Sequence, residues 1–108
     1  MRILVVDSVY KLMDRFESEL EGLYEDLKEL AGNRKYSFLE AEAILTADSF
    51  LDFIIERLSG FVIRPDIPDD LVERAENLLQ YAYEVRDFIY ANFQDVYRER
   101  HRYNFKVG

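Results

Sequence analysis

The fold is decided by residues 75–97, which read AENLLQYAYEVRDFIYANFQDVY. Apolar side chains recur there every three or four positions, and this spacing predicts an amphipathic helix. They form three neighbouring rows: Ala75, Ala82, Ile89 and Val96; Leu78, Tyr81, Val85 and Phe88; and Leu79, Tyr83, Arg86, Tyr90, Phe93 and Tyr97. A helix that is apolar over more than half of its circumference must be covered on more than one side.

We expect this helix to span residues 68–101. Pro68 suits a first helical turn, where its missing N–H costs nothing, and Asp69 and Asp70 favour the positive end of the helix dipole. Such a helix would be roughly 50 Å long, against about 35 Å for each helix before it. We therefore expect it to overhang its partners from about Asn92.

Two further helices are predicted upstream, over residues 9–31 and 37–59. The first carries one apolar stripe: Val9, Met13, Phe16, Leu20, Leu23, Leu27 and Leu30. Gly32 and Asn33 predict a left-handed stop after it. Ser37 with Glu40 three residues later is the pattern of a capping box, in which each side chain satisfies the other residue's backbone amide.

These elements predict an all-α fold with residues 1–108 in one helical domain and a short basic tail over residues 98–108. Connections of about four and seven residues favour antiparallel neighbours, and hence an up-down-up three-helix bundle with a long third helix. We expect the bundle to dimerise into a larger helical bundle, because two shorter helices leave part of the third uncovered.

Composition restricts the function classes. The chain of 108 residues has a formal charge of −8, no cysteine and 49% hydrophobic residues, so it should fold without disulfides. An acidic body repels phosphates and membrane surfaces, which argues against direct nucleic-acid binding and favours a basic partner protein. With no stretch long enough for a signal or membrane segment, we expect a cytoplasmic protein.

One candidate interface lies on the predicted third helix. It comprises Tyr83, Arg86, Tyr90, Phe93 and Tyr97. Tyrosine and arginine are enriched at the energetic centres of protein interfaces, so this row is expected to bind a second copy or a partner helix. The alternative is that the tyrosines pack in the core of the monomer with their hydroxyls reaching solvent.

A second candidate surface consists of acidic residues spaced four apart along two helices. They are Glu17, Glu21, Glu25 and Glu29 on the first, and Asp48, Asp52 and Glu56 on the second. Like charges at this spacing destabilise an isolated helix. The rows could contact a basic protein or imitate nucleic-acid phosphates. Alternatively, they form a solvated face that keeps the protein soluble.

No pattern predicts a cofactor, a metal or a catalytic set. A carboxylate-bridged metal pair in a helical bundle needs Glu-x-x-His, whereas the single His101 follows Glu99 by two positions. The interpretation that the sequence favours is therefore a non-enzymatic interaction module, an adaptor or an inhibitor.

The tail offers an alternative function. His101, Arg102 and Tyr103 form a His-x-Tyr sequence that is similar to the motif of helical HEPN-type ribonucleases. That resemblance implies RNA cleavage or a toxin-type role carried by the basic tail. The family motif also places an arginine ahead of the histidine, with four to six residues between the two. Here those places hold Gln94, Asp95 and Val96, and the nearest arginine is Arg98, which puts the resemblance in doubt.

Overall fold

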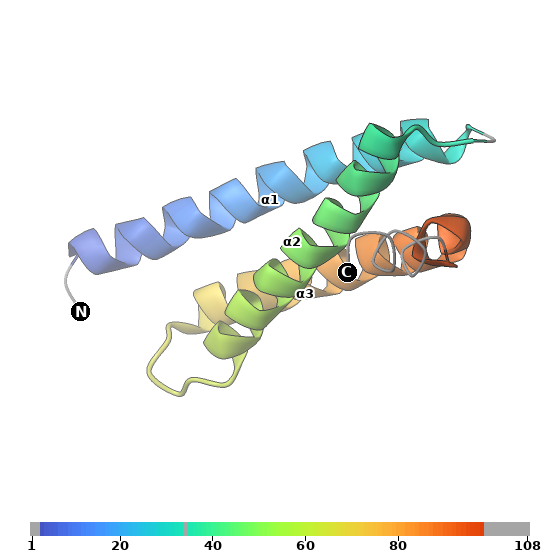
Figure 1. Cartoon of the computed structure of the whole chain (residues 1–108). Coiled ribbons are helices and arrows are strands. Elements are labelled where there is room, and N and C mark those ends of the chain that lie inside the picture. Colours follow the sequence, from blue (N-terminus) through green and yellow to red (C-terminus); the bar gives the residue numbers. More distant parts are fainter. Residues whose placement is uncertain (1–2, 34, 99–108) are drawn as a thin grey trace, which may run out of the picture.

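A computed structural model describes residues 3–33 and 35–98, and three main helices make up most of that part of the chain. They are α1 (Ile3–Ala31), α2 (Phe38–Val62) and α3 (Asp69–Asn92). The part of the chain described contains no strand, so the predicted all-α class is confirmed. Figure 1 shows the three helices packed together, with α2 crossing α1 at a steep angle.

Helix α3 is the element that both other helices cover. It packs most closely against α2 and also along α1, whereas α1 and α2 contact each other least. Two of its three apolar rows face these partners. The rows include the fully buried Ala75, Ala82, Val85 and Ile89. On the α1 side, the ring of Tyr24 lies edge-on to that of Phe88, with 5.3 Å between the ring centres.

Helix α1 begins at Ile3, six residues earlier than predicted. Its stripe faces the core as predicted, with Met13 and Leu20 fully buried. The left-handed stop is wrong, because no described residue has a positive φ. Instead the amides of Gly32 and Asn33 donate to carbonyls three residues back, which ends the helix in right-handed turns.

Helix α2 begins with the predicted capping box. The Ser37 hydroxyl accepts a hydrogen bond from the Glu40 amide at 3.1 Å, and the Glu40 carboxylate accepts one from the Ser37 amide at 3.0 Å. The bond from the Ser37 backbone holds the pKa of Glu40 below its usual value. Helix α2 then continues past the predicted end at residue 59, as far as Val62.

The prediction of one long third helix over residues 68–101 is wrong within the part of the chain described. Helix α3 ends at Asn92, and Phe93 leaves the helical conformation with φ −125° and ψ 32°. Helical turns resume over residues 94–98, and residues beyond 98 lie outside those described. With 24 residues, α3 is shorter than α1 with 29 and α2 with 25, so it is not the longest helix.

The break at Phe93 has a packing cause. The Phe93 side chain is fully buried, and its ring centre lies 5.6 Å from that of Tyr36 and 6.2 Å from that of Phe88. Val96, one turn further on, is also buried. The bend therefore turns two apolar side chains into the chain's own core, in the stretch that was expected to overhang.

Three hydrogen bonds tie α1 to α3 at the surface. Arg74 donates to Asp14 at 2.5 Å and to Glu17 at 2.9 Å, and these hydrogen bonds raise the pKa of its guanidinium. The Tyr10 hydroxyl donates to the Asp70 carboxylate, which raises the pKa of Tyr10. The buried side chains among those described are all apolar, so polar pairing between the helices occurs at the rim of the core.

None of the helices, over the residues described, has the length and apolarity needed to cross a bilayer.

The capping box gives a first prediction. Replacing Ser37→Ala removes a side-chain acceptor from the first turn of α2, and we expect it to lower the free energy of unfolding by about 1 kcal/mol. Ser18→Ala, at an exposed position within α1, is the matched control and should cost nothing. Urea unfolding followed by circular dichroism measures both. Equal effects would contradict a capping role for Ser37.

The bend at Phe93 gives a second prediction. Phe93→Ala should lower the free energy of unfolding by about 3–5 kcal/mol, because it empties a fully enclosed site. Tyr90→Ala, three residues away on the exposed side, should cost on the order of 1 kcal/mol, mostly its contacts with Arg86 and Tyr97. Chemical denaturation distinguishes the two. A Phe93 variant as stable as the Tyr90 variant would show that Phe93 does not anchor the bend.

Candidate interaction surface

The exposed part of the predicted tyrosine row lies on α3. The side chains of Tyr83 and Tyr90 are 44% and 41% exposed, although both are large and aromatic. They stand seven residues apart, which is two helical turns, so they lie on the same face. Two of the five residues predicted for the interface are therefore accessible aromatic rings.

Arg86 lies between these tyrosines and connects α3 to α2. Its Nε donates a hydrogen bond to the Tyr90 hydroxyl at 2.8 Å, and its terminal nitrogen pairs with the Asp52 carboxylate of α2 at 3.1 Å. The bond to Tyr90 raises the pKa of the Arg86 guanidinium. Its two partners hold the guanidinium in place and the Tyr90 ring with it, so this face is ordered before any partner arrives.

The other two residues of the row are less accessible. Phe93 is fully buried, so its predicted place on an accessible interface is wrong: the bend after Asn92 rotates it into the core. Tyr97 is partly buried against the core, and its ring lies edge-on to that of Tyr90 at 5.7 Å. Tyr83, Arg86 and Tyr90, with Tyr97 at the margin, are called the tyrosine face below.

The acidic residues are interleaved with cations rather than forming uninterrupted rows. Glu17 pairs with Arg74 of α3, and Glu25 pairs with Lys28 one turn away at 2.8 Å. Asp52 pairs with Arg86, as described above. Three of the seven predicted acidic surface residues thus have a basic partner. Sequence spacing missed two of these pairs because their members come from different helices.

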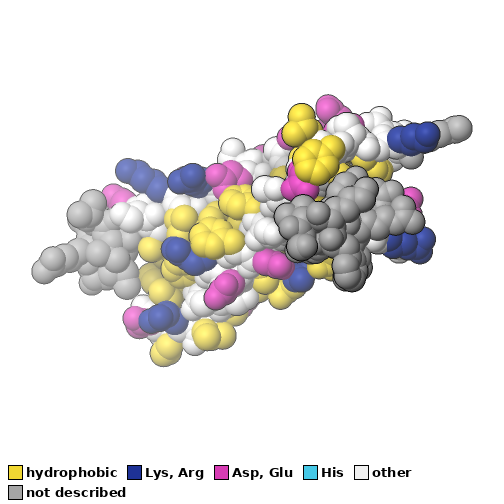
Figure 2. Space-filling view, in the orientation of Figure 1, with side chains coloured by type: hydrophobic (Ala, Val, Ile, Leu, Met, Phe, Trp, Pro, Cys, Tyr) yellow, Lys and Arg dark blue, Asp and Glu magenta, His cyan; other side chains and the backbone are white. Residues whose placement is uncertain are grey.

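The other four acidic residues have no ion pair within the described part of the chain. Glu21, Glu29 and Glu56 are exposed, whereas Asp48 is half-buried and contributes to the electrostatic environment of Arg86. On the face that Figure 2 presents, acidic and basic side chains are scattered among hydrophobic ones. Within the predicted acidic row of α1, Glu21 and Glu29 are the two exposed members without an ion pair among the described residues.

The basic tail falls mostly outside the described residues. Arg98 is described and lies 3.8 Å from Asp95, at an exposed position. His101, Arg102 and Tyr103, which carry the resemblance to HEPN-type ribonucleases, lie outside. Among the side chains that the structure describes, no group of three His, Cys, Asp or Glu is placed to hold a metal ion.

No protein-family model, curated protein or solved structure matches this chain. The function of the chain is therefore inferred from the tyrosine face and the acidic residues on its surface.

The environment of Tyr81 gives a prediction about the acidic row of α1. Burial raises the pKa of the Tyr81 phenol, and the nearby negative charge of Glu21 raises it further. Glu21→Lys should therefore lower the pKa of Tyr81, whereas Glu29→Lys, on the same row but not among the charges that act on Tyr81, should leave it unchanged. Tyrosine-selective NMR titration measures both. A Tyr81 pKa that does not move in the Glu21 variant would contradict this contact across α1 and α3.

Proposed function

We propose that this protein is a non-enzymatic protein–protein interaction module that associates with a second copy of itself through the tyrosine face. In this proposal the chain forms a single cytoplasmic domain with up-down-up helices. Two such domains join into a larger helical bundle. The observation that carries the proposal is the pair of exposed rings, Tyr83 and Tyr90, on either side of an arginine that is already held in place.

Preorganisation supports this surface over the exposed side chain of Ile63. Ordering a flexible side chain on binding costs free energy, and a face whose groups are already bonded avoids much of that cost. Arg86 is held by Tyr90 and Asp52, and Tyr90 also contacts Tyr97. By contrast, Ile63 is 81% exposed at the end of α2, where it offers a single aliphatic side chain.

Charge supports a second copy as the occupant. Two chains of charge −8 repel each other over most of their surfaces, so contact is favoured where acidic charge is already offset. At the centre of the tyrosine face the Arg86 guanidinium offsets Asp52. Tyrosine rings on both copies could then stack across the two-fold axis of a symmetric dimer.

The acidic side of α1 remains available for a further partner in this proposal. Glu21 and Glu29 are exposed and form no ion pair among the described residues. A basic protein, including one that binds nucleic acid, is the partner that such charge attracts at long range. The module would then act as an adaptor or an inhibitor, with self-association on α3 and partner binding on α1.

The dimer is tested by sedimentation at micromolar concentration. We expect the wild-type chain to sediment as a dimer and the double variant Tyr83→Glu, Tyr90→Glu as a monomer, because four carboxylates would meet at the two-fold axis. Ile63→Glu adds the same charge at a more exposed apolar position away from this face, and it should leave the dimer intact. A monomeric wild type, or a double variant that still dimerises, would refute the proposal.

A further inference from the structure

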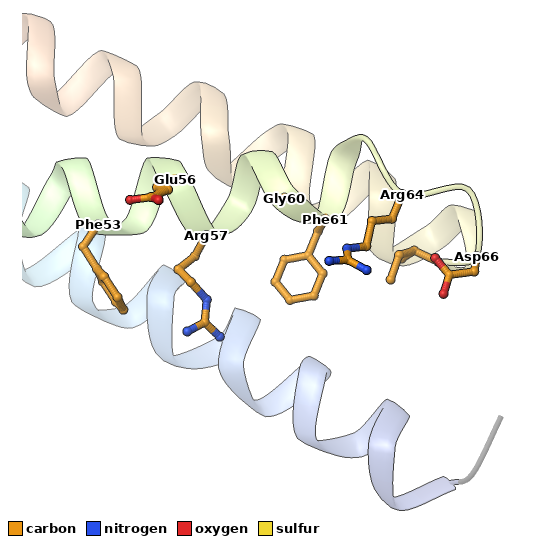
Figure 3. Close-up of a pocket in the computed structure, with 8 residues that line it drawn as sticks. Phe53, Glu56, Arg57, Gly60, Phe61, Arg64 and Asp66 are labelled. Atoms are coloured by element: carbon orange, nitrogen blue, oxygen red, sulfur yellow. The ribbon is translucent and has the colours of Figure 1, made fainter.

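A pocket of about 600 Å³ lies along the C-terminal half of α2 and the segment that leads to α3. Figure 3 shows Phe53, Arg57 and Phe61 projecting from one side of α2 toward α1. The described residues that line it are Phe53, Glu56, Arg57, Gly60, Phe61, Arg64, Asp66 and Ile67.

The helical repeat brings these residues together. Phe53, Arg57 and Phe61 follow one another at intervals of four, so they share one face of α2. This is the stretch where α2 moves away from α1, and the Phe53 side chain remains 48% exposed although its ring touches that of Phe16 edge-on. The backbone at Gly60 borders open space, since a Cβ there would meet nothing within 4 Å.

The two arginines of the pocket differ from the other arginines described. Arg15, Arg74, Arg86 and Arg98 each pair with a carboxylate. Arg57 and Arg64 have no such pair within the part of the chain that the structure describes, although Glu56 and Asp66 line the same pocket. In Figure 3 the two guanidinium groups lie on either side of the Phe61 ring.

Aromatic rings accompany both cations. The guanidinium carbon of Arg57 lies 5.8 Å from the centre of the Phe53 ring, and Phe61 lies between the two arginines. A guanidinium binds phosphate, sulfonate or carboxylate through a planar fork of N–H donors. Phenyl rings at the same place favour a flat apolar group, which they contact face to edge or by offset stacking.

We propose that this pocket binds a small anion that carries an aromatic ring. Its anionic group would accept hydrogen bonds from the guanidinium groups of Arg57 and Arg64, and its ring would pack against Phe53 and Phe61. The pocket volume falls within the range of small-molecule sites. In a chain of charge −8, Arg57 and Arg64 offset Glu56 and Asp66 of the same lining, so the pocket itself presents no net negative charge to an anion. The site is separate from the tyrosine face, whose Asp52 contact lies on the α3 side of α2.

Naphthyl phosphate is the probe, titrated into the whole chain while backbone amide chemical shifts are recorded. We expect saturable shifts at residues 53–67, with weaker binding of inorganic phosphate, which lacks the ring, and of naphthol, which lacks the charge. Shifts confined to other parts of the chain, or equal affinity for all three compounds, would overturn the proposal. So would the absence of saturation at millimolar probe.

Three variants test the pocket itself. The double variant Arg57→Gln, Arg64→Gln should weaken binding at least about tenfold for each cation lost. Gly60→Leu should fill the pocket and abolish binding without changing any charge, because its side chain enters open space. The double variant Arg15→Gln, Arg98→Gln, at two exposed positions outside the pocket, is the charge-matched control and should bind as wild type does.

Affinity unchanged in both pocket variants would refute the assignment, and circular dichroism confirms that each variant is folded. The Tyr83→Glu, Tyr90→Glu chain should bind the probe normally. Failure of self-association and failure of this site are therefore distinguishable.

Discussion

The structure depends on the burial of α3 by both of its neighbours. Ala75, Ala82 and Ile89 are fully enclosed along its centre, where α1 and α2 both pack against it. Both α1 and α2 pack against α3, and they have little contact with each other. Figure 1 shows α2 crossing α1 at a steep angle. The core is one continuous apolar cluster. The pocket that contains Arg57 and Arg64 lies where α1 and α2 separate.

The packing around α3 also divides the aromatic residues at its C-terminal end and just beyond it into two groups. The bend at Phe93 directs that ring against Tyr36 and Phe88, where it loses all contact with solvent. Tyr90, three residues earlier, stays on the outside with its hydroxyl bonded to Arg86. The chain thus buries more of its own apolar surface than the sequence spacing predicts. The face proposed to bind a second copy is smaller and more polar than the predicted row of five residues.

Charge separates the two proposed sites. The tyrosine face has an internal ion pair, Arg86 with Asp52, so little net charge opposes the approach of another acidic chain. The pocket beside it on α2 holds Arg57 and Arg64, whose charge is left for an anion. Adjacent positions on one helix, Asp52 and Phe53, face these different surroundings because successive residues point about 100° apart.

The sequence by itself determined the helical class, the three helices, the apolar stripe of α1 and the capping box at Ser37 and Glu40. These depend on spacing within one element and on local hydrogen bonds, which a linear pattern records. Tertiary structure alone decided that α3 ends at Asn92, that Phe93 is buried, and that Arg74 and Arg86 pair with acids of other helices. It also decided that Arg57 and Arg64 share a pocket. Those outcomes depend on which side chains meet across elements, and the free energy of such contacts exceeds the local preference for continuing a helix.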